Sequence, residues 1–218
     1  MITHSYGTGS PVTLVAHGLG ATPGEARIPA SGLPGTRVVV TLPSHGDAPD
    51  APPGYWDYGR IAADLGSVPA DFALGVSLGA GALVRLLSLE PDRFRRVALL
   101  LPAVLDQPRP PITLQQLSDL TVGPPIYVAE RRAALTRLSA AAEQLPGQVA
   151  VADTALLASV EIPVLVIGAV GDPLHPEDVA KATVAAFPNG ELWLIDSPTP
   201  MITHRTELRH RLAEFFAG

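Results

Sequence analysis

The stretch FALGVSLGAGALV, residues 72–84, joins a short apolar run of strand character, a serine between two glycines, and a segment that favours helix. Glycine stands two residues before and two residues after Ser77, as in the pattern G-x-S-x-G, in which the chain turns too tightly from strand to helix for larger residues. The turn pushes the hydroxyl of Ser77 away from the backbone and sets the amide of Leu78 beside it. Free N–H groups at a helix N-terminus favour a developing negative charge. The stretch therefore predicts a nucleophilic serine with one oxyanion donor next to it.

The composition favours one domain, residues 1–218, with a core of aliphatic side chains, because 47% of the residues are hydrophobic and only 5% are aromatic. The formal net charge of −6 comes without a basic run, so nucleic acid is not an expected partner. Cysteine is absent, which excludes disulfides and thiolate metal sites. Neither a signal peptide nor a long apolar segment is recognised, so we expect a cytoplasmic protein with no membrane partner.

Strand-like and helix-like segments alternate along the chain. Short apolar runs predict strands at residues 12–16, 37–41, 72–75, 97–101, 163–168 and 191–195. Helices are expected over residues 55–65, 78–90, 178–187 and 203–216. This alternation predicts an α/β fold, with a mostly parallel twisted sheet and helices on both faces. In such sheets, functional groups gather at the carboxyl ends of the strands.

Residues 103–160 interrupt the alternation. This segment contains no convincing strand; it begins with a proline-rich part and continues with an expected helix over residues 113–120 and an Ala/Arg-rich helix over residues 128–144. We interpret it as a helical cap or lid inserted over the strand ends. A plain packing layer is the alternative reading of the same pattern.

Two further turns and one histidine carry a family resemblance. HGLG, residues 17–20, follows the first predicted strand, and GDPLHP, residues 171–176, follows the fifth. With the Ser77 turn and a histidine near the last helix, the chain resembles the α/β-hydrolase family, in particular its compact lactonase, esterase and haloperoxidase-like branch. The resemblance extends over nearly the whole chain except the insertion. The family order of nucleophile, acid and base implies Ser77, Asp172 and His204, and the family implies a second oxyanion amide at Leu19.

The position of the histidine departs from the family pattern. Members of this branch carry Gly-His in the loop before the final helix, whereas the loop here reads IDSPTPMI over residues 195–202 and is about two residues short. His204 would then lie one turn into the helix, displaced by about 5 Å along its axis. A base must lie within hydrogen-bond reach of its nucleophile. The other readings are a histidine in the first turn of the last helix for His204, and a turn or N-cap carboxylate for Asp172.

The remaining histidines near strand ends are candidates for lining the pocket. His17 and His45 each precede a glycine after a strand, and His175 follows Asp172 by three residues. We expect His175 at the loop surface. Should His204 not reach Ser77, His175 and His45 are the next candidates for the base. No set of His, Asp and Glu has metal-ligand spacing, and no cofactor is predicted.

The sequence thus predicts a cofactor-independent serine hydrolase that acts on an ester, thioester or lactone of a small, largely apolar molecule. Ser77 would be the nucleophile, His204 the base and Asp172 the orienting acid, and the amides of Leu19 and Leu78 would bind the oxyanion. The first alternative keeps the fold but has lost hydrolysis through the altered histidine loop, leaving a binding, lyase or isomerase-type protein. The second is a structural or partner-binding protein. No oligomeric state is predicted.

Overall fold

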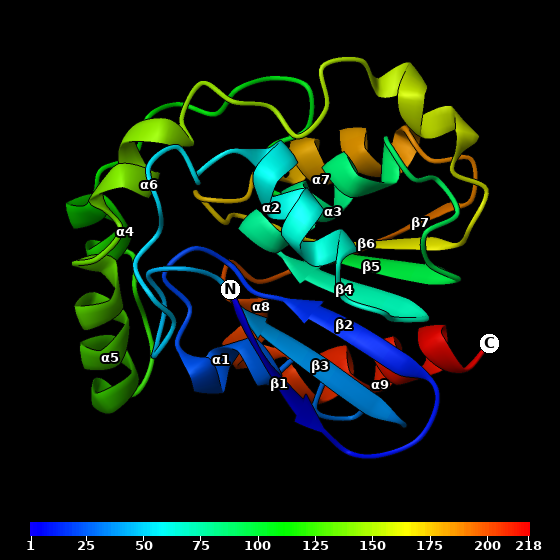
Figure 1. Ribbon diagram of the computed structural model, residues 1–218, viewed down its shortest axis with the longest axis horizontal. Helices are drawn as coiled ribbons and strands as arrows, with labels where there is room; N and C mark the ends of the chain where they lie inside the picture. The colour runs from blue at the N-terminus through cyan, green and yellow to red at the C-terminus, as the bar shows by residue number, and fades with distance from the viewer.

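Seven strands form one twisted sheet in a computed structural model that describes residues 1–218, apart from the side chains of Pro23 and Ala26 (Figure 1). The order across the sheet is β1-β3-β2-β4-β5-β6-β7. Only β1 runs antiparallel to its neighbour. The strands are β1 (Ile2–Tyr6), β2 (Val12–Ala16), β3 (Thr36–Thr41), β4 (Phe72–Val76), β5 (Arg96–Leu100), β6 (Val164–Ala169) and β7 (Gly190–Ile195). The predicted mostly parallel sheet is confirmed.

Strand β1 is the one strand that the sequence pattern did not predict. Its residues read ITHSY, and three of the five are exposed at the edge of the sheet. It therefore has no apolar run to mark it, and pairing with β3 supplies its backbone hydrogen bonds. Strands β2 to β7 lie close to their predicted ranges because each contains a run of β-branched or aliphatic residues.

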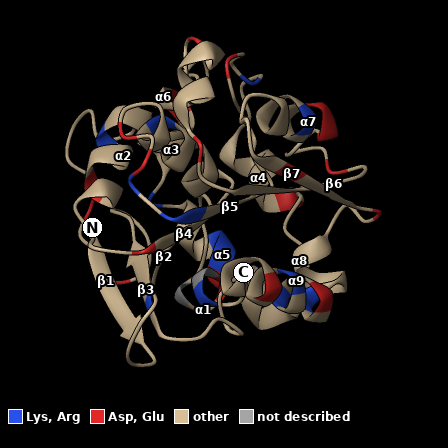
Figure 2. Cartoon of the chain, turned by 90° about the vertical axis from the view of Figure 1, so that its right-hand side faces the viewer, with Lys and Arg blue, Asp and Glu red and all other residues tan. Residues whose placement is uncertain are grey.

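Helices cover both faces of the sheet (Figure 2). One face carries α1 (Pro23–Arg27) and α9 (Arg205–Ala217), and the other carries α2 (Tyr58–Gly66), α3 (Leu78–Leu87) and α7 (Glu177–Ala185). A one-turn helix, α8 (Pro200–Thr203), precedes α9. The apolar side of α9 packs on the sheet as the sequence predicts, and its buried side chains are Leu208, Leu212, Phe215 and Phe216.

Residues 103–160 contain helices α4 (Leu114–Asp119), α5 (Pro125–Leu135) and α6 (Ser139–Gln144) and a 3₁₀-helix, η1 (Thr154–Ser159). No strand lies among them in the described chain. The continuous helix expected over residues 128–144 is wrong, because the chain leaves helical geometry at Leu138, whose φ is −115°. The break allows the fully buried Leu138 to pack into the core. In Figure 1, α4, α5 and α6 lie on the side where the parallel strands end.

The carboxyl ends of the central strands are level with one another. Ala16 of β2 pairs with Gly75 of β4, Val76 of β4 with Leu100 of β5, and Leu100 with Ile167 of β6. The loops that follow β2, β4 and β6 therefore leave the sheet at one edge. These three loops carry the residues that the sequence singles out, with the exception of His45 and His204.

Candidate active site

Ser77 occupies a strained corner between β4 and α3. Its φ of 51° and ψ of −108° are uncommon for a residue with a side chain. A Cβ added at Gly75 would lie 2.7 Å from the backbone of Gly79, and one added at Gly79 would lie 2.5 Å from the carbonyl oxygen of Ala16. No side chain fits at either glycine, so the predicted tight turn is confirmed.

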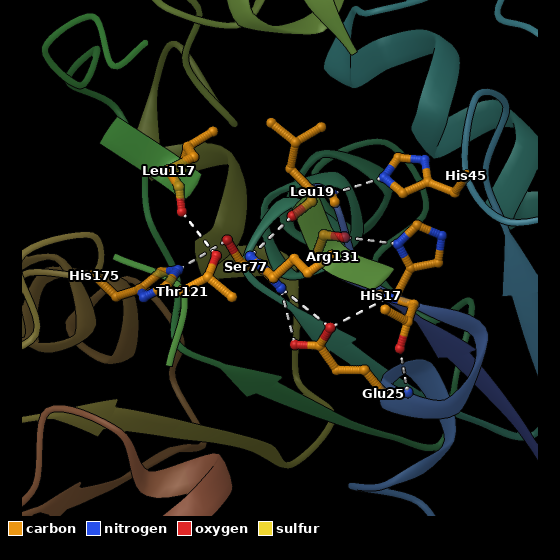
Figure 3. Close-up of polar contacts among 12 residues, drawn as sticks. His17, Leu19, Glu25, His45, Ser77, Leu117, Thr121, Arg131 and His175 are labelled. Carbon is orange, nitrogen blue, oxygen red and sulfur yellow. Dashed lines mark hydrogen bonds and ion pairs between the residues drawn. The ribbon is translucent and has the colours of Figure 1, made fainter. Parts of the chain in front are cut away.

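A chain of two short hydrogen bonds joins Ser77 to Asp172 through His175. The Nε2 atom of His175 lies 2.9 Å from the Oγ of Ser77 (Figure 3). The Nδ1 atom of the same ring lies 2.7 Å from Oδ2 of Asp172. The side chains of His175 and Asp172 are 13% and 9% exposed. In the neutral ring, Nδ1–H donates a hydrogen bond to the carboxylate, so the lone pair of Nε2 faces the serine hydroxyl.

The local turn fixes the carboxylate of Asp172. Its Oδ1 accepts a hydrogen bond of 2.8 Å from the amide of Leu174, two residues further on. Burial alone would raise the pKa of Asp172, but the hydrogen bond and charge of His175, together with the amides of Leu174 and His175, hold this pKa below its ordinary value. Asp172 is therefore ionised at neutral pH, as a group that orients an imidazole must be.

Loop 17–20 packs directly against the Ser77 corner. A Cβ on Gly18 would lie 3.3 Å from the Cβ of Ser77, and the amide of Gly79 donates a hydrogen bond of 3.1 Å to the carbonyl of His17. Leu78 is the first residue of α3, so its amide has no acceptor within the helix. Loop 17–20 and the N-terminus of α3 are therefore in contact beside the serine.

Two buried imidazoles hold this loop in place. The amide of Leu42 donates to Nε2 of His17 at 3.0 Å, and the amide of Gly20 donates to Nε2 of His45 at 2.9 Å. Each Nδ1 lies 2.8 Å or 3.0 Å from a backbone carbonyl, so each ring carries its single proton there. Burial lowers the pKa of His17. Burial lowers the pKa of His45 to about 3, and the adjacent His17 imidazole contributes because two neighbouring positive charges would repel each other. Both rings are neutral supports for the loop.

Comparison with solved structures identifies the fold. An esterase from Exiguobacterium antarcticum superposes with a TM-score of 0.83 at 16% identity, covering 99% of this chain and 95% of that one. An enol-lactonase from Burkholderia xenovorans gives 0.82 at 16% identity, covering 100% and 96%. A serine hydrolase from Cycloclasticus zankles gives 0.80 at 17% identity, covering 99% and 93%. The chain has the α/β-hydrolase fold. By sequence, no family model and no curated protein matches it.

Within this α/β-hydrolase fold, the structure corrects the expected position of the base. The prediction that His204 faces Ser77 is wrong. Helix α8 already begins at Pro200, so the short loop after β7 carries His204 to the junction of α8 and α9, where its Nδ1 lies 2.8 Å from the hydroxyl of Thr203. The interpretation of His175 as a loop-surface residue is also wrong, because its imidazole takes the place beside the serine.

A local signal for His175 was present in the sequence. Asp172 and His175 are three residues apart in GDPLHP, and α7 begins only at Glu177, so both side chains belong to one short loop at the end of β6. An aspartate that bonds to the amide two residues on forms a turn, and here that turn brings the imidazole back onto the second carboxylate oxygen. The family order of residues favours His204, whereas the local turn favours the pair of Asp172 and His175.

A pocket with a volume of about 100 Å³ opens at Ser77. Of the predicted pocket-lining histidines, His17 and His175 border it; His45 is not among the described residues that do so. Its apolar wall is made by Leu19, Val76, Leu101, Leu117, Leu174 and Met201, and two arginines, Arg109 and Arg131, reach it from residues 103–160. The pocket is therefore apolar with a cationic part.

Arg131 on α5 links the inserted segment to loop 17–20 (Figure 3). Its guanidinium lies 3.0 Å and 3.1 Å from the carboxylate oxygens of Glu25 and donates at 3.2 Å to the carbonyl of Leu19. The side chains of Arg131 and Glu25 are only 17% and 19% exposed. This largely buried contact sets the position of α5 above the serine.

No group of three His, Cys, Asp or Glu side chains among the described residues is arranged to hold a metal ion. No described helix combines the length and the apolar character that crossing a membrane requires.

Proposed function

We propose that this protein is a serine hydrolase that forms an acyl-enzyme on Ser77, with His175 as general base and Asp172 as the acid that orients it. One observation carries the proposal: the hydroxyl, the imidazole and the carboxylate are joined by hydrogen-bond distances of 2.9 Å and 2.7 Å. A serine hydroxyl is a weak nucleophile at neutral pH, so it needs an adjacent base of this kind.

The reaction follows from this geometry. As the Oγ of Ser77 attacks the acyl carbon, Nε2 of His175 takes the serine proton, and Asp172 stabilises the resulting imidazolium. The amides of Leu19 and Leu78 donate to the developing oxyanion, each contributing on the order of 3 kcal/mol. The imidazolium then gives its proton to the leaving oxygen or sulfur. Water then attacks the acyl-enzyme while His175 takes its proton, and His175 returns that proton to the Oγ of Ser77 as the acid leaves. With a tethered substrate, an internal nucleophile can take the place of water.

The proposed substrates are esters, thioesters or lactones of small molecules. The pocket of about 100 Å³ suits a small acyl group, and the solved structures of similar fold include an esterase and an enol-lactonase. Residues 103–160 would act as a cap, since Leu117 and Arg131 border the pocket from that segment. The alternative of a fold that has lost hydrolysis was based on the displaced His204. His175 supplies the imidazole that this alternative assumed to be missing.

The acyl-enzyme can be detected by intact-protein mass spectrometry after brief mixing with 4-nitrophenyl acetate. We expect an acetyl adduct on the wild-type protein, located on the peptide that contains Ser77, and none on Ser77→Ala. Ser67→Ala is the matched control, because Ser67 is an exposed residue just after α2, and it should form the adduct normally. Hydrolysis that continues at the wild-type rate in Ser77→Ala would contradict the proposal.

A further inference from the structure

Arg109 is a half-buried cation in the wall of the Ser77 pocket. A guanidinium is always charged and presents five N–H donors. Among the described residues, no carboxylate lies within ion-pair distance of Arg109, and no protein acceptor takes a hydrogen bond from its side chain. Tyr58, whose pKa burial raises to about 12, is close enough for the charge of Arg109 to oppose that rise. Arg109 therefore borders the Ser77 pocket and a second hollow that Asp178 also lines, and among the described residues no side chain pairs with its charge.

Arg131, the second arginine of the pocket, already has partners within the protein. Arg131 has its charge balanced by Glu25 and a further donor satisfied by the carbonyl of Leu19. Among the described charged side chains that line the pocket, Arg131 and Glu25 form an ion pair, whereas Arg109 has no carboxylate partner. The protein as a whole carries a formal charge of −6. An unpaired guanidinium in the wall of a pocket attracts an anionic group of a ligand.

We propose that Arg109 binds a carboxylate on the substrate, so that the preferred substrates are small anionic esters, thioesters or lactones whose acyl part ends in a carboxylate. This inference rests on the proposed serine hydrolase. A carboxylate can accept two parallel N–H bonds from one guanidinium. The neighbouring Leu117 and Leu174 are apolar, and such surroundings strengthen the attraction between the two charges. The inference replaces the largely apolar substrate expected from the sequence.

The test compares anionic and neutral esters of equal chain length. The half methyl esters of succinate, glutarate and adipate are set against methyl butanoate, methyl pentanoate and methyl hexanoate, with acid release followed by pH-stat titration. We expect kcat/KM for the best half ester to exceed that of its neutral counterpart by about 10- to 100-fold, the range for a hydrogen-bonded charge pair. In Arg109→Gln this preference should disappear, mainly through a higher KM for the half esters.

Two variants control for the loss of an arginine. Arg132→Gln removes an exposed arginine of α5 that follows Arg131 in the sequence and does not border the pocket. This variant should keep the preference for half esters. Arg109→Lys keeps the charge without the planar pair of donors and should retain part of the preference; it also carries the test if Arg109→Gln does not fold. The preference should weaken as salt is raised.

Failure of this inference differs from failure of the proposed function. Equal hydrolysis of neutral and anionic esters by the wild type, or a preference that survives in Arg109→Gln, would overturn the role of Arg109 while leaving the serine hydrolase intact. Hydrolysis that does not depend on Ser77 would instead remove the foundation of both proposals. Competition provides a second readout, since glutarate should protect Ser77 from a fluorophosphonate in the wild type and not in Arg109→Gln.

Discussion

Replacing His175 by alanine should lower kcat/KM for a small ester by about 10⁴- to 10⁶-fold, the range seen when the base of a serine triad is removed. Among the described residues, the imidazole of His175 is the group placed to take the proton of Ser77, with Nε2 at 2.9 Å from the hydroxyl. Without it the hydroxyl has no acceptor as it attacks. The measurement is steady-state hydrolysis of 4-nitrophenyl acetate after correction for the uncatalysed rate, with circular dichroism to verify the fold.

His204→Ala is the matched control for this variant. His204 was the base expected from the family pattern, but its ring is bonded to Thr203 between α8 and α9. Its removal should leave kcat/KM unchanged. If His204→Ala were inactive and His175→Ala active, the arrangement around Ser77 described here would be wrong, and the family position of the histidine would be restored.

Lowering the pH from about 7.5 to about 4.5 should destabilise the protein, chiefly through His17 and His45. The folded-state pKa of His45 is about 3 and that of His17 is also lowered, against 6.5 for an unperturbed histidine. Between these values, the unfolded chain binds protons that the folded protein cannot. The free energy of unfolding therefore falls with falling pH below 6.5, by up to about 1.4 kcal/mol per pH unit for each histidine.

Urea unfolding at a series of pH values measures this effect. In His45→Gln the free energy of unfolding should depend less steeply on pH, with a slope smaller by the equivalent of up to one bound proton. A glutamine carbonyl can accept the hydrogen bond from the amide of Gly20 without titrating. His210→Gln, which alters an exposed histidine on α9, should keep the wild-type dependence. The lowered pKa of Asp172 works in the same direction only at lower pH, since its contribution is lost as pH falls below about 3.8. An unfolding free energy that stays constant from pH 7.5 to 4.5 would contradict neutral, buried rings.

Much of the fold could be predicted because local pattern and final environment agree. Strands β2 to β7 contain short apolar runs, and α9 has one apolar side. The glycines around Ser77 are required because an added Cβ would lie 2.5 Å or 2.7 Å from the backbone. The unpredicted strand β1 is held by pairing with β3 rather than by an apolar pattern. The break before α6 follows from the packing of Leu138 in the core, and helix propensity, a local property, does not predict it.

The candidate site was predictable in part for a similar reason. Ser77 lies in a stretch whose local conformation is set by its own glycines, and Asp172 lies in its own turn. The family order of nucleophile, acid and base favours His204 over His175, but the loop after β7 is too short for a histidine at that point to reach Ser77. The contact of His175 with Ser77 spans 98 residues. Such a contact depends on where the carboxyl ends of β4 and β6 lie relative to each other. Those positions are set only when the whole sheet has formed.

The most direct measurement is the rate at which a fluorophosphonate labels Ser77, because this reaction reports activation of the hydroxyl without knowledge of the natural substrate. Labelling should be fast in the wild-type protein and in His204→Ala, several orders of magnitude slower in His175→Ala, and absent in Ser77→Ala. Labelling of His175→Ala at the wild-type rate would contradict the central claim that His175 activates this serine.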